Sequence, residues 1–226
     1  MGAAILRRHD LLRVEPAAWR DMLRRHPAIA DLPLVEDWAL RAWPVIARRR
    51  LECDGVASVA AALPLPPCHG KRRIGFNFRS RADVTLLPPV LLRDAARCAP
   101  AAWQPTISAL IDLGASVGAP PRVFGALLWQ HATGLPYLTD QSDLDLLWSP
   151  ADEPAAASLV AGLWRLDSVS PVRLDGELEL LDGGGVNWRE IASETGIPND
   201  VALVKTIVGV EMRKVDALFC ARGAEA

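Results

Sequence analysis

The segment Ser142–Trp148 constrains the fold most, because it places two carboxylates inside an otherwise apolar run. In an extended strand, successive side chains point to opposite faces, so Asp143 and Asp145 share one face and Leu144 and Leu146 the other. Their Cα atoms are then about 7 Å apart, and both carboxylates can reach one divalent cation. Adjacent acids are costly to bury without compensation. The alternative is a strand with one hydrated face, and the pair alone favours that plainer interpretation.

Composition indicates an ordinary globular protein. The 226 residues are 50% hydrophobic and 23% charged, with a net charge of −2. The chain lacks the overall basic charge of many nucleic-acid binders and any apolar run of about 20 residues, so we expect neither nucleic acid nor membrane as a partner. No apolar segment follows the N-terminal arginines, which predicts no signal peptide. The four scattered cysteines are then free thiols of a cytoplasmic protein.

The first part of the chain predicts a small α/β unit. Trp19, Met22 and Leu23 have helical spacing within residues 6–25. Residues 44–49 and 56–63 are predicted as strands, with Asp54-Gly55 as the turn between them. A proline-rich segment, residues 63–76, should be irregular. It contains three consecutive cations, Lys71, Arg72 and Arg73, directly after Gly70. A hydrated basic loop and a clamp for phosphates explain these cations equally well.

A second unit should begin near residues 79–90, and we take the bounds as 1–82 and 83–226. Helices are predicted over residues 90–98 and 101–113, then a short strand over 121–125 and a helix over 126–133. A strand, the Gly125 turn and a helix N-terminus together can bind a phosphate through free backbone amides. Sharp turns also need glycine for steric reasons, so Gly125 alone is weak evidence.

The remaining segments continue a mixed α/β pattern. Residues 152–166 and 210–219 are predicted as helices, residues 172–181 and 201–205 as strands, and residues 222–226 as a frayed tail. On the strand 172–181, Asp175, Glu177 and Glu179 share one face. Lys205 ends the last strand, where substrate binding and simple hydration are equally plausible roles.

These features suit phosphoryl or nucleotidyl transfer. Backbone amides and cations hold a triphosphate in such enzymes, and divalent ions bridge it to carboxylates. Mg²⁺ prefers hard oxygen ligands, so the cofactor expected beside Asp143 and Asp145 is Mg²⁺.

Two blocks of the sequence resemble a known family. Residues 122–147, with a glycine turn, a helix and an Asp-x-Asp strand, are similar to the core of the nucleotidyltransferase superfamily. That core, together with residues 63–74, 175–177 and 186–190, resembles the malonate decarboxylase holo-acyl-carrier-protein synthases, also called phosphoribosyl-dephospho-CoA transferases. The likeness covers most of the chain from about Trp43. It implies an α/β (α+β) fold, with a nucleotidyltransferase-like mixed sheet and flanking helices after a smaller N-terminal α/β unit.

The resemblance also implies a reaction. A serine of the apo acyl carrier subunit of malonate decarboxylase attacks the α-phosphate of 2′-(5″-triphosphoribosyl)-3′-dephospho-CoA, and pyrophosphate leaves. By analogy Asp143 and Asp145 bind Mg²⁺, and Glu177 or Asp175 completes the site. Glu177 is the preferred choice because apolar strand residues follow it directly, and Glu179 is the third choice.

The same analogy assigns the substrate-binding residues. Gly125 and Ala126 would meet the triphosphate, with Lys71, Arg72 and Arg73 near the phosphates; Lys205 is a further candidate. The family turn usually carries serine after glycine, and Ala126 lacks that hydroxyl. Its loss costs on the order of 1.5–3 kcal/mol of phosphate binding, which activity can survive.

Two alternatives remain. The chain is either another nucleotidyltransferase, which uses ATP and a different acceptor, or a non-catalytic relative that acts as an interaction module. Pyrophosphate release with each donor distinguishes the first alternative. An Asp143→Ala variant that behaves like wild type would favour the second.

Overall fold

The computed structural model describes residues 6–219 and divides the chain into two compact units. Unit 1 comprises Met1–Pro89, Ala132–Tyr137 and Ile207–Gly209, and unit 2 comprises Val90–His131, Leu138–Thr206 and Val210–Ala226. The main division therefore falls between residues 89 and 90, and two short later segments belong to the first unit.

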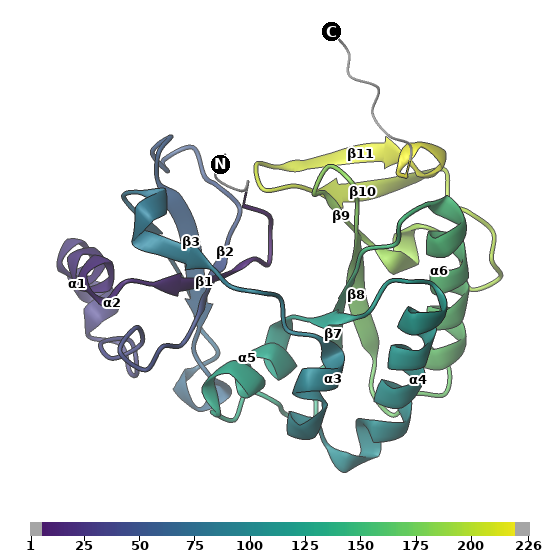
Figure 1. The fold of residues 1–226 in the computed structure, drawn as a ribbon, viewed down its shortest axis with the longest axis horizontal. Helices are drawn as coiled ribbons and strands as arrows, with labels where there is room; N and C mark the ends of the chain where they lie inside the picture. The colour runs from purple at the N-terminus through teal and green to yellow at the C-terminus, as the bar shows by residue number, and fades with distance from the viewer. Residues whose placement is uncertain (1–5, 220–226) are drawn as a thin grey trace, which may run out of the picture. The chain divides into compact units, whose positions relative to one another are not determined.

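Unit 1 is built on a five-stranded antiparallel sheet with the order β4-β3-β2-β1-β5 (Figure 1). Helix α1 (Pro16–Arg25) buries the predicted Trp19, Met22 and Leu23, and the Trp19 ring meets Phe76 edge to face at 5.4 Å. The other elements are β1 (Leu11–Val14), α2 (Pro27–Ala30), β2 (Val45–Ala47), β3 (Val59–Pro64), the 3₁₀ turn η1 (Pro67–His69), β4 (Arg73–Phe78), η2 (Arg81–Asp83) and β5 (Val84–Leu86).

Residues 63–76 are more regular than expected. Strand β4 pairs with β3 along its whole length, from Val59 opposite Phe78 to Pro64 opposite Arg73. The prolines do not interrupt this ladder because they lie at the end of β3 and in the turn that follows. Strands β1 and β5 were likewise not predicted, since neither short segment shows a clear alternation by itself.

Unit 2 is a six-stranded mixed sheet with the order β11-β10-β9-β8-β7-β6, in which only β7 and β8 are parallel. Its elements are α3 (Leu92–Ala95), η3 (Ala96–Cys98), η4 (Ala101–Trp103), α4 (Gln104–Ser116), β6 (Arg122–Val123), α5 (Gly125–Thr133), β7 (Leu144–Trp148), α6 (Glu153–Asp167), β8 (Leu174–Glu179), β9 (Gly185–Asn187), η5 (Trp188–Glu190), β10 (Val201–Lys205), β11 (Val210–Lys214) and η6 (Val215–Ala217). The predicted α+β class is confirmed.

The sheet of unit 2 has one apolar face and one polar face. Leu144, Leu146 and Leu174 are buried on the apolar face, and helices α4 and α6 lie side by side over it (Figure 1). The two helices approach closely, because a Cβ on Gly162 of α6 would stand 2.5 Å from Cδ1 of Leu113 of α4. The opposite face carries the charged residues of the strands, including the predicted acids.

The predicted helix over residues 210–219 is wrong. Residues Val210–Lys214 form β11, which pairs antiparallel with β10 from Val201 opposite Lys214 to Lys205 opposite Val210. The backbone N–H and C=O groups of this segment form hydrogen bonds with β10, and the helical part of residues 210–219 is the short turn η6. The predicted frayed tail, residues 222–226, lies outside the described residues.

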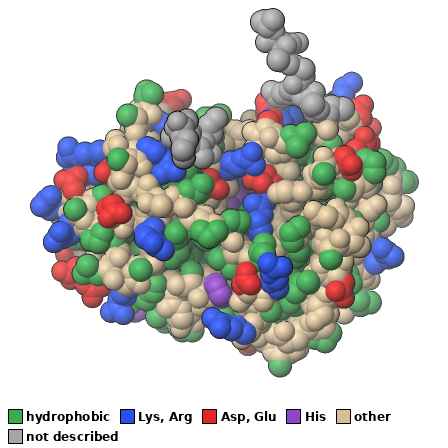
Figure 2. All heavy atoms as spheres, viewed as in Figure 1, with side chains coloured by type: hydrophobic (Ala, Val, Ile, Leu, Met, Phe, Trp, Pro, Cys, Tyr) green, Lys and Arg blue, Asp and Glu red, His purple; other side chains and the backbone are tan. Residues whose placement is uncertain are grey.

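The surface carries no large field of one charge on the face in view, where basic and acidic side chains are interspersed (Figure 2). Cys53, Cys68 and Cys98 are free thiols, as predicted. Cys220 lies outside the described residues. Within residues 6–219, no helix is long and apolar enough to cross a membrane.

Candidate active site

The predicted glycine turn and the predicted Asp pair meet in unit 2. Gly125 begins α5 with φ at +61°, and the preceding Phe124 amide donates to the Asp145 carbonyl oxygen at 3.1 Å. A Cβ atom on residue 125 would overlap the Asp145 carboxylate. The carboxylate of β7 therefore lies directly against the N-terminus of α5, where the backbone favours anions.

Asp143 does not lie within the strand as predicted. The chain makes a turn in which the Ser142 amide donates to the Thr139 carbonyl oxygen, and the ladder to β8 begins only at Leu144. Asp143 sits one residue before β7, 3.6 Å from the Arg173 guanidinium, with about a third of its side chain exposed. It lies two residues before Asp145 along the chain.

Asp175 is the acid that register places beside Asp145. The two residues are Cα partners in the parallel β7–β8 pair, so their side chains leave the same face of the sheet. Oδ1 of Asp175 accepts from the Gly176 amide at 2.8 Å and from Nδ2 of Asn187 at 2.9 Å. These contacts hold one carboxylate oxygen in place on the polar face.

Glu177 has a different environment. It is buried, with 5% of its surface exposed, and its Oε1 accepts from Nζ of Lys205 at 2.8 Å. A buried carboxylate needs such a compensating charge. Lys205, predicted to bind substrate, therefore neutralises Glu177 in this structure.

Glu179, the third choice from the sequence, is also paired. Its Oε2 accepts from the Arg122 guanidinium and from the Ser149 hydroxyl, each at 3.0 Å. Arg122 belongs to β6 and donates to Ser149 as well. Glu179 of β8 is thus connected to Arg122 of β6 and to Ser149, which follows β7.

The basic residues Lys71, Arg72 and Arg73 lie in unit 1. Gly70 and Lys71 both have positive φ, at +83° and +51°, and Arg73 begins β4. All three cations are exposed and form no ion pair among residues 6–219. Their charge is available to an anionic ligand, and their part in substrate binding stays a prediction.

The carboxylates of Asp145 and Asp175 are suitable ligands for a Mg²⁺ ion that would also coordinate the phosphates of a substrate. No group of three or more His, Cys, Asp or Glu side chains converges on a metal position in the described part of the chain. Mg²⁺ usually takes only one or two carboxylates, together with waters and substrate phosphates. Asp145 and Asp175, in register on one face, supply that number of hard oxygen ligands.

Sequence reasoning missed three residues of this face. Asn187 holds Asp175, Arg173 lies beside Asp143, and Arg122 pairs with Glu179. Asn187 belongs to a stretch that resembles the family. No local pattern indicates which carboxylate the Asn187 side chain contacts. That information comes from the pairing of β8 with β9.

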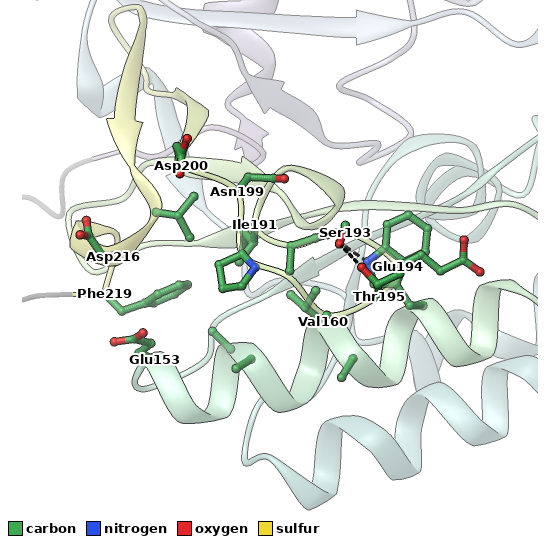
Figure 3. Close-up of a pocket in the computed structure, with 18 of the residues that line it drawn as sticks. Glu153, Val160, Ile191, Ser193, Glu194, Thr195, Asn199, Asp200, Asp216 and Phe219 are labelled. Carbon is green, nitrogen blue, oxygen red and sulfur yellow. Dashed lines mark hydrogen bonds between the residues drawn. The ribbon is translucent and has the colours of Figure 1, made fainter.

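A separate groove of about 900 Å³ lies between α6 and the loop 191–200 (Figure 3). Its apolar part includes Val160, Ile191 and Phe219, and the hydroxyls of Ser193 and Thr195 are 2.8 Å apart at one side. None of the described residues predicted for the active site lines it. The groove is therefore distinct from the polar face of the sheet.

Comparison with known proteins defines the family. The model described as "Phosphoribosyl-dephospho-CoA transferase MdcG N-terminal domain" matches residues 7–89, and that of the C-terminal domain matches residues 91–216. A Bradyrhizobium diazoefficiens protein named phosphoribosyl-dephospho-CoA transferase is 40% identical over 184 residues, 81% of each chain. A Xanthomonas campestris pv. campestris protein of that name is 35% identical over 192 residues, 85% of this chain and 88% of the relative. No solved structure matches the chain.

These relatives identify the chain as a transferase. More narrowly, it belongs to the phosphoribosyl-dephospho-CoA transferase family.

Proposed function

We propose that the enzyme transfers the phosphoribosyl-dephospho-CoA group from 2′-(5″-triphosphoribosyl)-3′-dephospho-CoA to a serine of the apo acyl carrier subunit of malonate decarboxylase. The serine oxygen forms a bond to the α-phosphorus, the bond from that phosphorus to the β-phosphate oxygen breaks, and pyrophosphate leaves. The serine loses its proton to the surrounding solvent or base. Family membership supports the transfer. The resemblance of residues 63–74 and 122–147 to the malonate decarboxylase holo-acyl-carrier-protein synthases supports the acceptor.

The single observation that carries the mechanism is the position of Asp145. Its carboxylate lies against Gly125 at the start of α5 and in register with Asp175 across β7 and β8. A triphosphate held by the amides of Gly125 and Ala126 would therefore lie next to two carboxylates. That proximity is what a metal-assisted transfer requires.

We assign Asp145 and Asp175 to Mg²⁺ binding, while Asp143 is paired with Arg173 one residue before β7. When bound, Mg²⁺ would stabilise the charge that develops on the phosphate oxygens and on the departing pyrophosphate. The backbone amides of Gly125 and Ala126 would hold the triphosphate beside Asp145, where the incoming serine can attack it. Lys71, Arg72 and Arg73 are proposed to add positive charge for the phosphates.

Asp175 suits the metal position beside Asp145 better than Glu177, the first choice from the sequence. Glu177 is 5% exposed and its charge is balanced by Lys205 at 2.8 Å. Asp175 is less buried and stands directly opposite Asp145. Glu177 then stabilises the sheet through its ion pair with Lys205, and Asp175 is the proposed metal ligand.

The identity of the donor can be tested by comparing two donors with the same acceptor protein. Pyrophosphate release should be measured with the triphosphoribosyl donor and with ATP, each with Mg²⁺ and a serine acceptor protein. Release with the dephospho-CoA donor alone supports the proposal. Release with ATP alone would identify a different nucleotidyltransferase.

A further inference from the structure

We propose that Asn187 is a positioning residue, which sets the Asp175 carboxylate for metal binding. This inference rests on the proposed function, since it concerns a ligand of the proposed Mg²⁺ site. It adds a residue that does not itself touch the metal or the substrate, and it makes the β9 strand part of the active-site frame.

The contacts of Asp175 are asymmetric. Oδ1 accepts two hydrogen bonds, from Nδ2 of Asn187 at 2.9 Å and from the Gly176 amide at 2.8 Å. Oδ2 has no protein partner within residues 6–219. Two donors on one oxygen fix the rotation of the carboxylate, and they leave the other oxygen available as a ligand.

The amide of Asn187 is itself fixed in orientation. Its Oδ1 accepts from the Arg189 backbone amide at 3.0 Å, where Asn187 caps the 3₁₀ turn η5. Because an N–H group occupies the Oδ1 side, the Nδ2 donor must face Asp175. The orientation therefore follows from the hydrogen bonds on both sides of the amide.

The segment after Asn187 is anchored to the start of β8, the strand that carries Asp175. The Arg189 guanidinium donates to Asp167 at 2.7 Å and to the Leu174 carbonyl oxygen at 3.0 Å. It also lies 4.9 Å and 4.1 Å from the ring centroids of Trp164 and Trp188. The contacts of Arg189 thus restrict movement of Asn187 relative to Asp175.

Residues that orient a metal ligand typically contribute 10–100-fold to metal affinity or activity, and we expect the lower end of that range for one amide. The test variants are Asn187→Ser and Asn187→Thr. Both hydroxyls are favourable helix caps and can still accept from the Arg189 amide, but neither reaches Asp175 as the longer amide does. Threonine also suits a strand, so it serves if serine loosens β9.

The probe is Mn²⁺, titrated by calorimetry against the full chain without substrate, so the readout does not depend on activity. The control is Asn199→Ser, which removes another amide of unit 2, one that donates to the Glu190 carbonyl oxygen. We expect both Asn187 variants to bind Mn²⁺ about 10-fold more weakly than wild type. Their Tm should stay within about 4 °C of wild type, and Asn199→Ser should bind normally.

The outcomes separate this inference from the proposed function. Wild-type affinity in a folded Asn187 variant, or an equal loss in Asn199→Ser, would overturn the positioning role even if the enzyme transfers the group. A wild-type protein that binds no Mn²⁺ would overturn it as well. Conversely, weakened Mn²⁺ binding in a protein that transfers nothing to the carrier would uphold Asn187 and defeat the proposed reaction.

Discussion

Gly125 and Asp145 lie so close that a Cβ atom at residue 125 would overlap the carboxylate of residue 145. The glycine also has φ at +61°, a conformation that residues with a Cβ rarely adopt. Two separate requirements, backbone conformation and space for a carboxylate, therefore coincide at this position. The start of α5 and the Asp145 carboxylate on β7 are therefore closely packed, and a change in one should move the other.

We predict that Gly125→Ala lowers kcat/KM for the donor about 100-fold or more, because the added methyl must displace Asp145, and misplacement of a reacting group by about 1 Å has that effect. Steady-state kinetics with the donor measures it. Gly118→Ala is the matched control, with φ at +66° and nothing within 4 Å of the new methyl. It should lose about 1 kcal/mol of stability and keep its activity. Equal kinetics in the two variants would contradict the overlap.

A second prediction concerns the alanine that follows the turn. Introducing a hydroxyl with Ala126→Ser should lower the KM for the donor about tenfold, the lower end of what a hydrogen bond of about 1.5–3 kcal/mol to a charged group provides. The control is Ala157→Ser on the exposed side of α6. An unchanged or higher KM in Ala126→Ser would show that this position does not meet the triphosphate.

The Lys205–Glu177 pair should be visible in stability rather than in donor binding. Lys205→Met leaves the 5% exposed Glu177 without its ammonium partner, and it should lower the free energy of unfolding by about 2–3 kcal/mol. The double variant Lys205→Met with Glu177→Gln should recover part of that loss, because no buried charge is left alone. Urea denaturation measures both. A double variant less stable than the single one would contradict this role.

Unit 1 contains a pH-dependent ion pair. Two hydrogen bonds of 2.8 Å from the Arg48 guanidinium lower the pKa of the Asp54 carboxyl from 3.8 to about 2. Since the folded pKa is the lower one, the stabilisation is complete above about pH 4 and is lost as the pH falls toward 2, by about 2 kcal/mol. Stability of Asp54→Asn should change less over that window. Parallel curves for the variant and wild type would contradict the assignment.

The sequence predicted the Gly125 turn, α5 and β7 better than the segments around them. The glycine turn, the α5 helix and the β7 strand are marked by local patterns, namely a glycine at a strand–helix junction and alternating acids and leucines. The segment around β11 shows why such patterns fail. Val210–Lys214 has no decisive periodicity, and its pairing with β10 determines that it is a strand.

The third carboxylate shows a different limit. Asp175 and Glu177 are two residues apart on one strand, so alternation places both on the same face and cannot rank them. Their ranking depends on partners that are distant in sequence, Lys205 and Asn187. Long-range pairing of strands supplies those partners, and no single segment contains that information.

The intact mass of the carrier tests the central claim most directly. Apo acyl carrier subunit of malonate decarboxylase should be incubated with Mg²⁺, the triphosphoribosyl donor, and either wild type or Asp145→Asn. We predict that wild type adds the mass of one phosphoribosyl-dephospho-CoA group to the carrier, and that Asp145→Asn adds it at least about 100-fold more slowly. An unmodified carrier with wild type, beside an active family enzyme as a positive control, would contradict the proposed reaction. Equal modification by Asp145→Asn would contradict the proposed site.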